Sequence, residues 1–148
     1  MWPAFWAMGA DIGTVGWPDC GEIDIMENIG KEPGIQHGSM HGPGYSDGHS
    51  LTGAYKLPKE EKLSDDFHLY AIVWTKDSIE FLFDGHSYFK ATPASVPKGK
   101  RWIFNKPFFL ILNVAVGGDW PHSPDSSTIF PQEMLIDYVR VYEPATGH

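Results

Sequence analysis

The sequence predicts an all-β fold, an antiparallel β-sandwich of short strands joined by turns. Three observations support this prediction. Short alternating or continuous apolar segments recur along the 148 residues, and 16 glycines and 12 prolines are spread between them. No segment shows the apolar stripe of a confident helix. A chain of this length can form one domain with a hydrophobic core, so we expect a single sandwich domain over residues 1–148.

The expected strands follow from local patterns and end at turn signals. The even positions from Trp2 to Met8 share one face of the first strand. Asp84-Gly85 is typical of a tight hairpin. An almost continuous apolar run, interrupted only by Asn113, favours a buried strand. The strands are expected over residues 2–8, 22–28, 35–41, 67–75, 78–83, 87–90, 108–116 and 134–142, and loops over 11–21, 42–53, 93–106 and 117–131.

Three carboxylates lie within six residues, at Glu22, Asp24 and Glu27. Alternation in a strand sends Glu22 and Asp24 to one face. Glu27 lies five positions after Glu22, so strict alternation sends it to the opposite face. One extra residue at Ile25-Met26, a β-bulge, returns Glu27 to the first face. A pair of carboxylates on one surface is what glycoside hydrolysis requires.

The alternative for this segment is the solvated face of an ordinary amphipathic strand. Two observations favour a functional site instead. Like charges at positions i and i+2 repel each other, and no Lys or Arg within the segment neutralises them. Trp2, Trp6 and Trp17 also precede the acids closely.

The composition limits the classes of molecule that the chain is expected to bind. The formal net charge is −8 with a pI near 5.2, and there is no basic patch, so nucleic acid is not an expected partner. A neutral polysaccharide is compatible with this charge. No apolar run is long enough to span a membrane, and no signal peptide is visible at the start of the chain. Cys20 is the only cysteine, so no internal disulfide is expected.

Five sequence blocks together resemble the glycoside hydrolase family 16 catalytic domain, in the family's order and over essentially the whole chain. They are WPAFW at 2–6, GEIDIME at 21–27, FHLYAIVWT at 67–75, FFLILNVAVGG at 108–118 and IDYVRVY at 136–142. The extra Met26 resembles the laminarinase branch. The resemblance implies a β-jelly roll of two curved sheets with a substrate groove on the concave face. It also implies retaining endo-hydrolysis of β-1,3-glucan or mixed β-1,3-1,4-glucan.

The resemblance gives each acid a role. Glu22 is expected to be the nucleophile that forms a glycosyl-enzyme intermediate, and Glu27 the acid and then the base. Asp24 is expected to hold a proton or to hydrogen-bond Glu22. Close carboxylates do not all ionise easily, so we expect a raised pKa, in particular for Glu27. A retaining mechanism predicts a carboxyl separation of roughly 5–5.5 Å between Glu22 and Glu27.

Other side chains are candidates for binding substrate. Aromatic faces stack on pyranose rings, so the tryptophans are either sugar platforms or part of the core. His41 matches a histidine near the acid/base in the family, or caps a turn. Asn113 hydrogen-bonds either sugar or protein, and His122 stands where relatives often have glycine. The expected substrate-binding residues are Trp2, Trp6, Trp17, His41, Asn113 and Trp120, the last as a wall of the groove.

No cofactor is required by the expected reaction, but the resemblance places a structural calcium near Asp137, for which a plain surface aspartate is the alternative. Relative to the family, the chain starts within the domain, so several N-terminal strands and most calcium ligands are expected to be missing. Three explanations compete: a truncation that still closes a sandwich, self-association through exposed sheet edges, and a poorly active fragment.

Two other functions stay open beside the β-glucanase. One is a non-catalytic glucan-binding sandwich, and the other is the same mechanism on agar, carrageenan or xyloglucan. By resemblance the expected location is extracellular or periplasmic.

Overall fold

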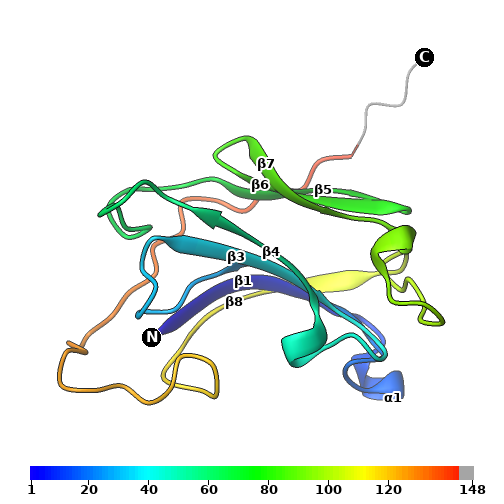
Figure 1. The fold of residues 1–148 in the computed structure, drawn as a ribbon, viewed down its shortest axis with the longest axis horizontal. Coiled ribbons are helices and arrows are strands. Elements are labelled where there is room, and N and C mark those ends of the chain that lie inside the picture. The colour runs from blue at the N-terminus through cyan, green and yellow to red at the C-terminus, as the bar shows by residue number, and fades with distance from the viewer. Residues whose placement is uncertain (144–148) are drawn as a thin grey trace.

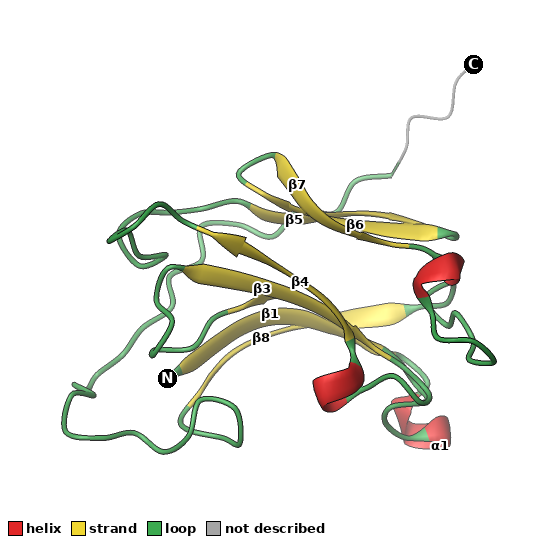
Figure 2. Cartoon of the chain, in the orientation of Figure 1, coloured by secondary structure: helices red, strands yellow, loops and turns green. Residues whose placement is uncertain are grey.

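The computed structural model describes residues 1–143 of the chain, and it consists of two antiparallel sheets (Figures 1 and 2). The five-stranded sheet has the order β4-β3-β2-β1-β8, and the three-stranded sheet the order β5-β6-β7. The strands are β1 Trp2–Gly9, β2 Glu22–Glu27, β3 Ile35–His41, β4 Leu51–Lys56, β5 Tyr70–Thr75, β6 Ser78–Phe83, β7 His86–Ala91 and β8 Phe108–Ala115. The predicted all-β sandwich is confirmed.

The core lies between the two sheets. Burial alternates along β6, where Ile79, Phe81 and Phe83 are buried while their neighbours are only partly covered. Ile23 of β2 and Met40 of β3 belong to the same buried cluster from the other sheet. Since alternate residues of a strand point to opposite faces, the residues between these core positions are free to form a second face.

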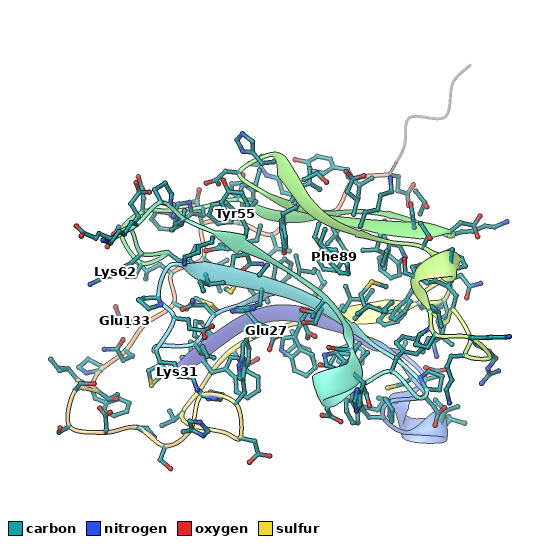
Figure 3. All side chains as sticks on the ribbon, viewed as in Figure 1. Glu27, Lys31, Tyr55, Lys62, Phe89 and Glu133 are labelled. Carbon is teal, nitrogen blue, oxygen red and sulfur yellow. The ribbon has the colours of Figure 1, made fainter. Side chains whose placement is uncertain are left out.

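The strand β4 is a correction to the sequence prediction, which had a loop up to residue 53. A glycine in the middle of a polar stretch hid the strand. Gly53 pairs with Gly38 of β3, and a Cβ built on it would lie 2.5 Å from the Cβ of Phe89. The glycine is therefore the residue that lets Phe89 of β7 approach the five-stranded sheet, and Figure 3 shows Phe89 between the sheets.

The strand predicted over residues 134–142 is wrong, because no strand is assigned there. Most of its apolar side chains are exposed instead, with Leu135 at 69% and Val141 at 81% of full exposure. A period-two pattern becomes a strand only when a neighbouring edge offers hydrogen bonds, and none of the described strands pairs with this segment.

Helical structure is confined to short turns in the expected loops. These are α1 Ile12–Val15 and the 3-10 turns η1 Asp47–His49 and η2 Pro93–Ser95. Within residues 1–143, no helix combines the length and apolar character needed to cross a membrane.

The sheets also have open edges, at β8 and at β5. Exposed apolar side chains gather on both, among them Phe109 and Leu110 of β8 and Val73 and Trp74 of β5. Self-association through these edges stays a prediction.

Candidate active site

A β-bulge in β2 brings the three acids onto one face. In the pairing with β1, Met8, Trp6 and Ala4 lie opposite Glu22, Asp24 and Glu27 in turn. Two residues of β1 thus span three of β2, and the extra residue is Ile25. Residues directly opposite each other in a ladder share a face. The predicted bulge is confirmed, and its effect is to place all three carboxylates on one side of the sheet.

The neighbouring strands add polar and aromatic residues to this face. On β3, His41, Ser39 and His37 lie opposite Glu22, Asp24 and Glu27. On β8, Asn113 lies opposite Ala4. Figure 3 shows Glu27 on the side of the five-stranded sheet that faces away from the three-stranded sheet. We call this surface the acidic face.

Glu22 is held from the loop that carries α1. The indole N–H of Trp17 donates to its Oε2 at 2.7 Å, and His41 Nε2 lies 3.9 Å from its Oε1. Burial raises the pKa of Glu22 to about 7, and the neighbouring charge of Asp24 adds to the shift. Trp17 stabilises the charged carboxylate and opposes this shift. Glu22 can therefore carry the negative charge of a nucleophile near neutral pH.

Asp24 is the most buried acid of the three, with 2% of its surface exposed. Burial raises its pKa, while a hydrogen bond with Glu22 acts in the opposite direction. Its Oδ2 lies 3.0 Å from His41 Nε2, yet this oxygen has no hydrogen bond within the described residues, so the contact is electrostatic. Since the two carboxyls share a hydrogen bond, Glu22 and Asp24 titrate as a pair.

Glu27 has the highest pKa of the three acids. Burial raises it to about 8, and the charge of Asp24 adds to this. The indole N–H of Trp2 donates to Glu27 Oε1 at 2.9 Å and lowers the pKa in part. The raised pKa of Glu27 was predicted from the sequence. In the structure the pKa values of Glu22, Asp24 and Glu27 are all raised. A carboxyl that keeps its proton at neutral pH has the property of a general acid.

The ring of His41 is oriented by the loop around η1. The backbone N–H of Asp47 donates to His41 Nδ1 at 3.0 Å, which assigns the ring proton to Nε2. Glu22, Asp24 and His41 each offer a ligand atom within 4.8 Å of the others, and residues 1–143 contain no other such group of three. Metal ligation through Nε2 would require moving its proton to Nδ1, where Asp47 already donates. The geometry therefore fits a proton-sharing network better than a metal centre.

The remaining predicted binding residues lie on or beside the acidic face. Trp6 donates its indole N–H to Asn113 Oδ1 at 2.7 Å, so the amide oxygen of Asn113 is already engaged with protein. Trp17 has 39% of its surface exposed. Trp120 packs edge-to-face on Trp2, with ring centroids 5.7 Å apart. The structure brings all of these residues together, and their contacts with sugar stay predictions.

Asp137 lies apart from this site. It falls in the exposed segment that follows β8 without forming a strand, and it belongs to no group of three acidic, histidine or cysteine ligands within residues 1–143. Calcium binding near Asp137 stays a prediction.

Three residues that border the acidic face were not among the predicted site residues, namely Lys31, Glu32 and His37. His37 Nε2 lies 3.2 Å from Glu32 Oε2, and Lys31 donates to the carbonyl oxygen of Trp120 at 3.0 Å. The signal for His37 was its alternation with His41 in β3. Lys31 and Glu32 lie in a turn, where no alternation indicates which way the side chains point.

Paired carboxyls and tryptophans on one face of a β-sandwich fit the class of glycoside hydrolases, which act through two carboxyl groups. Residues 1–140 match the model of Glycosyl hydrolases family 16, and the chain belongs to this family.

Relatives of known name agree with this assignment. The structure of the endo-beta-1,3-glucanase from Pyrococcus furiosus is 52% identical, superposes with a TM-score of 0.85, and is matched over 88% of this chain and 50% of that one. The "Beta-glucanase" of Rhodothermus marinus is 37% identical over 95% of this chain and 51% of its own length. The "Glucan endo-1,3-beta-glucosidase A1" of Niallia circulans is 37% identical over 97% of this chain and 22% of its own length. The chain thus spans about a fifth to a half of these relatives.

Proposed function

We propose that this chain acts as a retaining endo-β-glucanase on β-1,3-glucan or mixed β-1,3-1,4-glucan. The observation that carries the proposal is the bulge in β2, which gathers Glu22, Asp24 and Glu27 on one face. The names of the relatives support β-glucan as the substrate class.

In the first step, the Glu22 carboxylate attacks the anomeric carbon while Glu27 gives its proton to the leaving glycosidic oxygen. The glycosidic bond breaks as a glycosyl ester of Glu22 forms. In the second step, Glu27 takes a proton from water, and the oxygen of that water displaces Glu22. Each step leaves Glu27 in the state that the next step requires.

Asp24 supports this cycle because it can hold a proton in place of Glu22 and so leave Glu22 charged. When the proton shared by the pair lies on Asp24, Glu22 is free to act as a nucleophile. His41 supports the same state, because its Nε2 lies 3.0 Å from Asp24 Oδ2 and 3.9 Å from Glu22 Oε1.

The alternative of a non-catalytic glucan-binding sandwich has one relative in its favour, the "Beta-1,3-glucan-binding protein" of Penaeus monodon, which is 32% identical over 91% of this chain and 43% of its own length. The buried carboxyls favour catalysis over binding alone. A binding surface does not need them, and burying a charged group is costly. Raised pKa values are typical of catalytic groups. We also propose that the chain works outside the cytoplasm, in the extracellular or periplasmic space, where glucan polymers are met.

The test is reducing-sugar release from laminarin, lichenan, agarose and xyloglucan. The wild type is expected to act on laminarin or lichenan, and Glu22→Gln to lose this activity by at least about 10²-fold, since it removes the nucleophile. Glu61→Gln, in an exposed turn before β5, is the matched control and is expected to retain activity. Binding of glucan without turnover by the wild type would contradict the catalytic proposal. Equal release by wild type and Glu22→Gln would contradict the role of Glu22, and release from agarose or xyloglucan alone would contradict the substrate class.

A further inference from the structure

A chain of contacts runs from β3 to the carboxyl of Glu27 through two tryptophans. The ring of Trp120 lies 4.9 Å from His37, at an interplanar angle of 84°. On its other side the same ring lies 5.7 Å from Trp2, at 87°. The indole N–H of Trp2 then donates to Glu27 Oε1 at 2.9 Å. Trp120 therefore connects His37 to the residue that holds Glu27.

The loop after β8 confines Trp2 from a second direction. Gly118 has φ +140°, and a Cβ on this residue would lie 3.0 Å from Cζ3 of Trp2. Only glycine allows the backbone to pack this closely on the indole in this conformation. Figure 1 shows this loop, in yellow to orange, beneath the N-terminal end of β1. The orientation of Trp2 thus depends on where the loop lies.

One polar contact joins the loop to the turn between β2 and β3, and a second contact from the same turn orients His37. Lys31 Nζ donates to the carbonyl oxygen of Trp120 at 3.0 Å. Glu32 Oε2 lies 3.2 Å from His37 Nε2 and orients that ring toward Trp120. His37 itself is directly opposite Glu27 in the β2–β3 ladder. The anchor of the loop and the acid are therefore neighbours in the same sheet.

We propose that His37 is a positioning residue for the proton donor: through Trp120 and Trp2 it sets the direction of the N–H that holds Glu27. The inference rests on the proposed role of Glu27 as the acid. His37 contacts no reacting atom, so its effect is confined to the two proton transfers of Glu27. The value of kcat/KM reports the first of them, the protonation of the leaving oxygen.

The contacts of His37 are strong enough to orient a loop but are not required for folding. An edge-to-face aromatic pair and a partly exposed ion pair are each weak contacts. The side chains of His37 and Glu32 are 19% and 40% exposed, so neither belongs to the core. Contacts of this size can select one arrangement of a loop, and losing them leaves the sandwich intact.

The test compares two leaving groups in the wild type, His37→Ala, His37→Phe and His49→Ala. His49 is an exposed histidine of η1 and serves as the matched control. The substrates are laminarin, whose leaving alcohol needs a proton, and a nitrophenyl β-laminaribioside, whose leaving phenolate does not. We expect His37→Ala to lose about tenfold in kcat/KM on laminarin and less than about twofold on the aryl substrate. His37→Phe keeps the aromatic edge and is expected to recover most of the loss, and His49→Ala is expected to match the wild type.

An equal loss on both substrates, no loss on laminarin, or His37→Phe as inactive as His37→Ala would overturn the inference. Urea midpoints of the variants confirm folding. If His37→Ala does not fold, Lys31→Met is tested in its place. It is expected to lose kcat/KM on laminarin but not on the aryl substrate, and to lose less than His37→Ala. A wild type that hydrolyses neither substrate would instead contradict the proposed function.

Discussion

The indole N–H of Trp2 donates a hydrogen bond to Oε1 of Glu27 at 2.9 Å, across the first two strands of the five-stranded sheet. Trp17 makes the equivalent contact with Glu22 at 2.7 Å. Each proposed catalytic acid is thus held by one tryptophan from outside its own strand. These tryptophans were expected as platforms for sugar, and the structure gives them a second role as donors to carboxyls.

Replacing Trp2 by Phe is expected to raise the pKa of Glu27. The Trp2 hydrogen bond stabilises the carboxylate and so lowers this pKa, and its loss removes the larger of the two contributions, from Trp2 and His41, that oppose burial. Because the acid must be protonated, the alkaline limb of kcat/KM on laminarin is expected to move to higher pH. Trp102→Phe is the control, since its indole N–H donates to the backbone of Lys76. A limb that stays in place or moves to lower pH would contradict the assigned hydrogen bond.

The free energy of unfolding is expected to fall as pH rises from about 5 to about 8. The pKa of Glu27 is 4.5 in the unfolded chain and about 8 in the folded one, so the native state binds more protons in this window. The stabilisation is complete below pH 4.5 and is lost as pH rises through about 8, at up to about 1.4 kcal/mol per pH unit for one proton. Glu27→Gln is expected to reduce the slope, and Glu22 and Asp24, whose pKa values are also raised, are expected to account for the remainder. Urea unfolding at several pH values measures it, and a slope unchanged by Glu27→Gln would exclude Glu27 as its source.

His122→Gly is expected to stabilise the chain by about 1 kcal/mol, because a non-glycine residue at positive φ is strained. His122 has φ +64° in the loop after β8. Denaturant unfolding of the variant and the wild type tests this. A lower midpoint for the variant would show that the side chain contributes more than the strain costs.

Gly53→Ala is expected to destabilise the sandwich by about 1–3 kcal/mol, the usual effect of overpacking. The added Cβ would meet Phe89 at 2.5 Å, between the sheets. Gly48→Ala is the matched control, since nothing lies within 4 Å of its added Cβ. Equal stability of both variants in a urea titration would contradict the close approach of β7 to β4.

The acidic face could be predicted from sequence because its causes are local. Alternation and a single extra residue decide where Glu22 and Glu27 point, and β2 follows this pattern. The shared face of His37 and His41 could be read in the same way. The contacts of Trp2 and Trp120 could not, since they join residues 118 positions apart in the sequence.

Strands whose existence depends on partners were the harder part of the fold. β4 was missed because Gly53 is a poor strand former alone and is required only by Phe89. Residues 134–142 have a strand pattern but no partner among the described strands. In both cases the decisive information lies in another segment of the chain.

The most direct test of the two-carboxylate mechanism is the configuration of the first product released from laminarin, followed by proton NMR before mutarotation. Double displacement through Glu22, with Glu27 as acid and base, predicts that the new reducing end appears first as the β-anomer. First appearance of the α-anomer would contradict the account, because it would require water to attack directly and Glu22 to act only as a base.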